Sequence, residues 1–153
     1  MAPDKETFWG LMNLHDVFLN ASLLRKNMIN SPIINDAREF DTSDRERFER
    51  MWIASLYVLV EAWNSLAMKG VREYIASKVD IQPVSSILAQ GYKDGSLKKM
   101  GQTRHYMFHR DKRKYWDIGR SSPWDQLEYH ERLHMTFSTV FLSVFREIEQ
   151  EDR

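Results

Sequence analysis

The chain has 153 residues, of which 42% are hydrophobic and 29% are charged, and its formal net charge is zero. This composition predicts one globular domain over residues 1–153, long enough to bury a hydrophobic core, and argues against wholesale disorder. The chain contains no cysteine. That excludes disulfides, thiolate zinc sites and cysteine nucleophiles, and we expect a cytoplasmic protein.

The sequence shows no sign of membrane insertion or secretion. Its first residues, MAPDKETFWG, include acidic side chains and no apolar run, so they do not resemble a secretory signal. The longest apolar stretch, residues 51–68, contains Glu61 and Asn64. Because a membrane span needs about 20 mostly apolar residues, we expect a buried core helix here and no membrane association.

A first helix is predicted over about residues 4–28. Apolar side chains recur at steps of three and four from Phe8 to Met28, and Asp4 is a suitable N-cap. Pro32 follows, and a proline disfavours helical backbone in the residue before it. We therefore expect the first helix to end just before this proline.

The second helix is predicted to be the longest. Thr42 or Ser43 can cap it, and a wide apolar stripe continues as far as Leu66, as in a helix that is buried on more than one side. We expect the helix to end at Gly70 or to continue to Asp80.

The remaining elements are also helical. Pro83 begins a short apolar piece that predicts one or two helical turns before a loop at residues 91–95. Residues 96–109 predict a third substantial helix, and a last helix is expected over about residues 123–149, after a polar loop and a cap at Ser122. No segment alternates for long with the period of a strand. The pattern predicts an all-α protein, an antiparallel bundle of four to five helices.

The segment RHYMFHRDKRKYW, residues 104–116, contains the most chemically suggestive pattern. Positions five apart on a helix differ by about 140° around its axis, so the side chains of Arg104 and His109 converge only if the helix ends near Phe108. The charged run that follows permits such an end. A histidine at a helix C-terminus can exchange protons, and an arginine offers forked donors to a phosphate.

An arginine and a histidine are suited to metal-free cleavage of RNA. The 2′-hydroxyl attacks the adjacent phosphorus, an imidazole moves protons, and a cation offsets the charge that develops on the phosphoryl oxygens. The alternative is an ordinary helix end with two exposed histidines, since short motifs often match by chance.

The pattern of Arg104, His105 and His109 before a final long helix resembles the R-x4–6-H signature of the HEPN domain family. These are small helical bundles of toxin–antitoxin, abortive-infection and CRISPR-associated systems. The resemblance implies a HEPN-like fold and a metal-independent endoribonuclease without a cofactor. It implies that Arg104 engages the scissile phosphate, that His109 is the general acid/base and that His105 orients or assists. It also implies an RNA substrate, a homodimer in which both Arg/His pairs line one cleft, and a cognate antitoxin protein.

One position departs from a branch of that family. Asp111 stands where members that pair with nucleotidyltransferase antitoxins have a tyrosine in R-x4-H-x-Y. Possible contacts to the RNA backbone come from the basic run after the motif, namely Arg110, Lys112, Arg113 and Lys114.

Charge is unevenly distributed around this motif. Residues 93–120 contain nine Lys or Arg against three Asp, a balance of +6, whereas residues 121–153 contain seven acidic residues against three Arg, a balance of −4. The first segment forms a basic patch that binds a polyanion, or else the two segments neutralise each other in the folded chain.

A metal site is the rival interpretation of the histidines. The chain has two H-x3-H pairs and one E-x-x-H pair: His105/His109, His130/His134 and Glu131/His134. Such pairs on facing helices can hold zinc or iron. A di-iron bundle needs a second E-x-x-H and further inward glutamates, and the only candidate is Glu61, so the ligand set is incomplete. We expect no metal.

Two other function classes stay open at this point. One is a non-catalytic helical module that binds a partner protein or a nucleotide, with the basic loop as a docking segment, and the other is the metal-binding bundle. Glu61 and Asn64 either support the Arg/His site, fix the helix register or are simply partly exposed.

Overall fold

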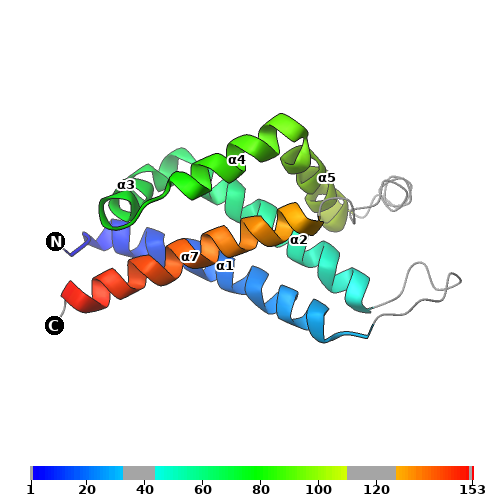
Figure 1. Ribbon diagram of the computed structural model, residues 1–153, viewed down its shortest axis with the longest axis horizontal. Helices are drawn as coiled ribbons and strands as arrows, with labels where there is room; N and C mark the ends of the chain where they lie inside the picture. The colour runs from blue at the N-terminus through cyan, green and yellow to red at the C-terminus, as the bar shows by residue number, and fades with distance from the viewer. Residues whose placement is uncertain (1, 33–43, 110–126, 152) are drawn as a thin grey trace, which may run out of the picture.

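The computed structural model describes residues 2–32, 44–109, 127–151 and 153. Within these ranges the chain forms six α-helices and one short 3₁₀ turn, with no strand. The all-α prediction is confirmed, whereas the predicted number of four to five helices is too low, because a break after α2 makes α3 a separate helix. The elements are, in chain order, α1 (Lys5–Asn30), α2 (Asp44–Asn64), η1 (Leu66–Met68), α3 (Lys69–Lys78), α4 (Gln82–Asp94), α5 (Ser96–His109) and α7 (Leu127–Glu151) (Figure 1).

The long helices α1 and α7 lie side by side and run in opposite directions (Figure 1). Their side chains meet in antiparallel order, because Arg25 bonds Glu131 while His15 lies against Phe145. α2 packs against α1, α5 and α7, and α4 packs against α5 and α7. Both chain ends lie at one end of the molecule, and α5 lies toward the other (Figure 1).

A single cluster of buried side chains draws residues from all six helices. Trp52 and Leu56 of α2 and Phe137 of α7 are fully buried, and Trp63 meets the ring of Phe137 edge-on at 5.4 Å between centroids. The apolar stripe of α2 is wide because several helices cover this helix.

Among the described residues, no single helix has the length and hydropathy to cross a membrane. α2 together with the following η1–α3 segment meets that test, but the pair is bent by 69°.

Local signals explain several helix ends. The side chain of Asp4 accepts a hydrogen bond of 2.7 Å from the N–H of Thr7, which confirms the predicted cap of α1. Pro83 lies in the first turn of α4, and Gly95 ends that helix with a left-handed φ of 80°. The caps predicted at residues 42–43 and at Ser122 lie outside the described residues.

The predicted length and the predicted end of the second helix are both wrong, since α2 has 21 residues against 26 in α1 and 25 in α7. α2 ends at Asn64, and Gly70 lies inside α3. The extended backbone of Ser65, with ψ of 148°, interrupts the helix. Arg72 stabilises the break, since its Nη1 donates hydrogen bonds to the carbonyl oxygens of Trp63 and Ser65.

The prediction for α4 also needs correction, because this helix spans 13 residues rather than one or two turns. Gly91 lies within it and does not begin a loop. A Cβ at this position would meet the hydroxyl of Tyr129 and come within 2.7 Å of its Cζ. The hydroxyl of Tyr129 in turn donates to the carbonyl of Ile87 at 3.0 Å. Gly91 therefore allows close packing of α7 on α4.

Candidate nucleic-acid interface

The outward face of α5 is basic, and the helix contains no acidic residue. Lys98, Gln102 and His105 are exposed and follow one another at steps of four and three, which places them on one stripe of the helix. The backbone position of His109 continues this stripe. Lys99 is also exposed beside it.

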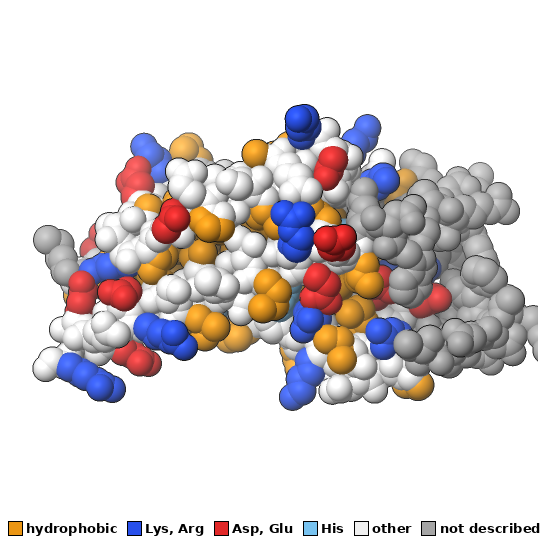
Figure 2. All heavy atoms as spheres, viewed as in Figure 1, with side chains coloured by type: hydrophobic (Ala, Val, Ile, Leu, Met, Phe, Trp, Pro, Cys, Tyr) orange, Lys and Arg blue, Asp and Glu red, His pale blue; other side chains and the backbone are white. Residues whose placement is uncertain are grey.

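Figure 2 shows one broad face of the molecule, on which positive and negative side chains are mixed with separate hydrophobic groups. Outside its grey atoms, that face offers no continuous basic surface for a polyanion.

Arg104 lies on the flank of α5 that meets α2. Its Nη2 is 3.6 Å from Oε2 of Glu61, and the two side chains are 39% and 45% exposed. The guanidinium carbon lies 5.8 Å from the ring centroid of Phe108, within range of a cation–π contact. Nε is buried and has no hydrogen-bond partner among the described residues. Because 3.6 Å exceeds hydrogen-bond length, the half-exposed guanidinium keeps donors for a ligand.

The residues around Arg104 form a strip along α2. Tyr57, Glu61 and Asn64 are spaced by four and three, so they share one face of the helix; we call them the α2 strip. The ring of Tyr57 lies against α5 where Gly101 has no side chain, since a Cβ there would be 2.8 Å from Cζ of Tyr57.

The α2 strip also contacts α4. Nδ2 of Asn64 donates a hydrogen bond of 2.9 Å to the hydroxyl of Tyr92. Burial raises the pKa of Tyr57, the neighbouring Glu61 and Tyr92 add to this rise, and Arg104 opposes it. Arg104, the α2 strip and Tyr92 therefore form one electrostatically connected group.

The sequence-predicted site residues fall into three groups. Arg104 and His105 lie on the described surface. Glu61 and Asn64 are exposed, as the interpretation of partial exposure predicted, and Glu61 lies 3.6 Å from Arg104. His109 is the last residue of α5, one position beyond the expected helix end near Phe108, and its side chain lies outside the described set. Its convergence with Arg104 stays a prediction. The basic run Arg110, Lys112, Arg113 and Lys114 also lies outside the described residues.

Sequence reasoning did not identify two members of this group. Tyr57 could have been found, because it precedes Glu61 by four residues on a predicted helix. Tyr92 gave no local signal, because its partner Asn64 lies 28 residues away in the chain.

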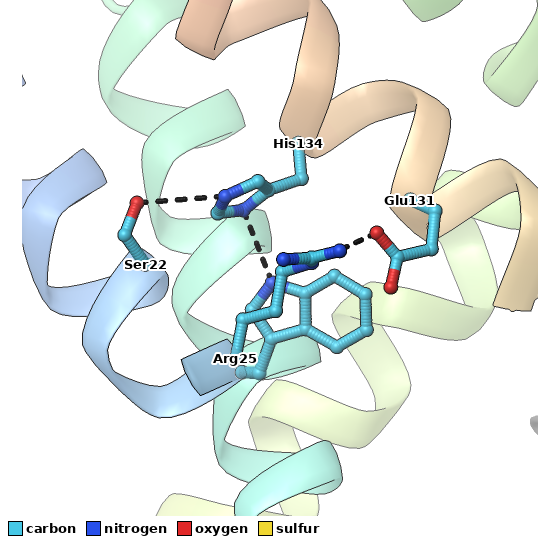
Figure 3. A network of polar contacts seen from close by, with 5 residues as sticks. Ser22, Arg25, Glu131 and His134 are labelled. Carbon is cyan, nitrogen blue, oxygen red and sulfur yellow. Dashed lines mark hydrogen bonds and ion pairs between the residues drawn. The ribbon is translucent and has the colours of Figure 1, made fainter. Parts of the chain in front are cut away.

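The other histidine pair lies in the core. His130 and His134 are only 2% and 5% exposed. Nδ1 of His134 accepts a hydrogen bond of 3.3 Å from the indole N–H of Trp52, so Nε2 carries the ring proton and faces the hydroxyl of Ser22 at 3.5 Å (Figure 3). His134 is therefore a buried side chain, and each of its ring nitrogens has a polar partner.

Glu131 does not join His134 in a ligand set. Its carboxylate accepts a hydrogen bond of 2.8 Å from Nε of Arg25, which lies on α1 (Figure 3). Over the described part of the chain, no three His, Asp or Glu side chains are grouped so that they could hold a metal ion.

Burial sets the charge of these core groups. It lowers the pKa of both His130 and His134 to about 4, and Arg25 contributes to the lowering at His134. Burial raises the pKa of Glu49 to about 7. Within the described residues, neither ring nitrogen of His130 has a hydrogen-bond partner, and neither does Oε1 of Glu49. At neutral pH the core histidines are uncharged, and they affect stability rather than surface chemistry.

Comparison with protein-family models, with curated proteins and with solved structures finds no match to this chain. The resemblance to the HEPN family therefore rests on the Arg104-to-His109 motif and on the all-α architecture.

Proposed function

We propose that this protein is a metal-independent endoribonuclease with a HEPN-like bundle fold. The supporting observation is the half-exposed guanidinium of Arg104, which lies beside the acid-free basic face of α5. A cation with unused donors at the edge of a basic helix face is suited to a phosphodiester.

Each residue of the motif has a distinct role in this proposal. Arg104 binds the scissile phosphate and offsets charge on its oxygens during attack by the 2′-hydroxyl. His109 moves the proton, and His105 orients the phosphate or assists. Arg110, Lys112, Arg113 and Lys114 contact the RNA backbone. Glu61 competes with the phosphate for Arg104, so RNA displaces an existing ion pair on binding.

The wider biological role comes from the resemblance alone. We propose a cytoplasmic homodimer that acts in a toxin–antitoxin or phage-defence system and is held inactive by an antitoxin protein. The exposed hydrophobic side chains of α1 and α7, which include Leu19, Leu23, Met135 and Leu142, are compatible with contacts to another protein chain.

Cleavage of RNA in excess EDTA tests the enzyme proposal. We expect His109→Ala to slow cleavage about 10²- to 10⁴-fold, the usual contribution of a general acid or base. Arg104→Ala should slow it about 10²- to 10³-fold, as for loss of a group that stabilises developing negative charge. The matched control is Arg146→Ala, which removes an exposed arginine on α7 and should cleave like the wild-type chain. Cleavage that needs a divalent metal, or that survives both motif substitutions, would contradict the proposal.

The second candidate is a non-catalytic module that binds RNA through the same face of α5. The exposed lysines of α5 favour it, since they need no reactive geometry. A folded protein that binds RNA equally well with and without His109→Ala, and never cleaves it, would select this candidate.

A further inference from the structure

A pocket of about 520 Å³ lies between the end of α2, α3 and α4. Trp63 and Leu88 contribute apolar surface to it, and both are buried in the core. Asn64, Tyr92 and Lys69 add polar and aromatic groups to its lining. The pocket therefore combines an apolar base with hydrogen-bonding groups, as small-molecule sites do.

The pocket adjoins the candidate interface through two of its lining residues. Asn64 belongs to the α2 strip, one turn after Glu61, the ion-pair partner of Arg104. Tyr92 accepts a hydrogen bond from Asn64. Both Tyr92 and Glu61 raise the pKa of Tyr57. A chain molecule that contacts Arg104 reaches the pocket by crossing about one helical turn, or about 5 Å, of α2.

The chemistry of the lining fits a nucleobase. Tyr92 is 64% exposed, so its ring offers a face for stacking, which stabilises each bound base substantially and tolerates any base. The amide of Asn64 spends one N–H on Tyr92 and keeps a second N–H and its carbonyl oxygen for a base edge. The lining contains two cationic side chains, Lys69 and Arg72, against one carboxylate, Glu73, which pairs with Lys69 at 3.8 Å. The charged side chains of the lining therefore sum to +1, which is compatible with an anionic nucleotide.

Arg72, which stabilises the break between α2 and α3, also holds one wall of the pocket in place. Its Nη1 donates hydrogen bonds to the carbonyl oxygens of Trp63 and Ser65, and the guanidinium keeps its positive charge. A larger groove, of about 740 Å³, lies between α4 and α7, but its lining contains no aromatic ring on which a base could stack. The smaller pocket is therefore the better match to a base.

We propose that the pocket between α2, α3 and α4 binds the base of a nucleotide that neighbours the phosphate at Arg104. This inference rests on the proposed function, because it makes the pocket a subsite for the same RNA. Tyr92 stacks on the base, and Asn64 contacts its edge.

The test uses a short 2′-O-methyl RNA oligonucleotide, which binds but lacks the 2′-hydroxyl nucleophile. Ultraviolet crosslinking followed by mass spectrometry should place the bound base on Tyr92 or on Trp63. Fluorescence anisotropy should show that Tyr92→Ala weakens binding about five- to a hundredfold, the loss expected for one stacked base. Tyr92→Phe keeps the ring and should bind within about threefold of the wild-type chain.

Trp9→Ala is the control, because Trp9 is an exposed aromatic residue on α1, outside the pocket; it should bind normally. Unchanged affinity of Tyr92→Ala, or crosslinks confined to residues outside the pocket, would overturn the subsite. If the Tyr92→Ala chain binds and cleaves RNA with the wild-type affinity and rate, the subsite proposal is wrong and the nuclease proposal is supported. Loss of oligonucleotide binding in Tyr92→Ala, with no cleavage by the wild-type chain, would keep the subsite and remove the nuclease.

Discussion

Gly91 has only a hydrogen atom where any other residue would meet the phenol of Tyr129. We expect Gly91→Ala to lower the free energy of unfolding by about 1–3 kcal/mol, since overfilled cores lose stability on this scale. A Cβ at this position also approaches Cγ of Leu97 at 2.8 Å, so the methyl group meets atoms on two sides. Urea denaturation followed by circular dichroism measures the change.

Gly70→Ala is the matched control, because Gly70 is also helical but a Cβ there meets nothing within 4 Å. It should leave stability unchanged or raise it by up to about 1 kcal/mol, through better helix propensity. Adding Tyr129→Phe to Gly91→Ala should recover part of the loss by removing the hydroxyl. Equal effects of the two alanine substitutions would show that packing of Tyr129 on α4 is not what Gly91 provides.

Individual residues of the candidate site differ in how far the sequence could predict them. Arg104 and His105 could be placed on a helix end because charged neighbours follow them directly. The contact between Arg104 and Glu61 could not, since it depends on how α5 crosses α2. The contact of Tyr92 with Asn64 could not be predicted either. A hydrogen bond between two helices does not alter the spacing of apolar residues in either helix.

At the scale of helices, boundaries were predictable where the signal is local. The Asp4 cap of α1 is a short-range feature with a known backbone preference. The end of α4 was predicted too early, at Gly91, whereas the left-handed glycine that ends it is Gly95. The break at Ser65 was not predictable, because its stabilising group, Arg72, lies seven residues further on and acts through its side chain. Gly70 was a false stop signal, as a solvent-facing glycine within a helix can be.

The α2–α3 junction provides a prediction at this scale. Arg72→Met keeps much of the apolar stem of the side chain but removes two hydrogen bonds from a charged donor to carbonyl oxygens. Such bonds contribute about 1.5–3 kcal/mol each, so we expect the loss of both to lower the free energy of unfolding by about 3–6 kcal/mol. Thermal and urea denaturation both measure this change.

Lys69→Met is the corresponding control on the same helix. Lys69 is exposed, and its partner among the described residues, Glu73 at 3.8 Å, is exposed too, so its loss should change stability by less than about 1 kcal/mol. A small effect of Arg72→Met, similar to that of the control, would mean that the chain breaks at Ser65 without help from Arg72.

For the whole molecule, the buried ionisable groups predict how stability varies with pH. His130 and His134 have pKa values lowered to about 4, against 6.5 for an ordinary histidine. The unfolded chain therefore binds more protons between these values, and stability falls as pH drops from 6.5 toward 4, by about 3 kcal/mol for each histidine. Glu49 acts in the opposite sense. With its pKa raised to about 7, it favours folding below pH 4.5 and loses that contribution as pH rises through 7.

Substitution of Glu49 separates the two effects. Relative to the wild-type chain, Glu49→Gln should gain about 3 kcal/mol of stability between pH 4.5 and pH 7, and should lose stability more steeply on acidification. Urea denaturation at half-unit pH steps measures both curves. Glu73→Gln, which changes an exposed carboxylate, should give a curve parallel to that of the wild-type chain. A parallel curve for Glu49→Gln as well would rule out a protonated Glu49 in the folded protein.

The antiparallel pairing of α1 with α7 puts both chain ends beside each other, far from α5 (Figure 1). Either terminus can therefore serve as an anchor for a dye, a bead or a sensor surface, with α5 directed into solution. Two preparations, each tethered through a different terminus, should report the same affinity for RNA. Agreement between the two would also exclude the tether itself as a source of binding.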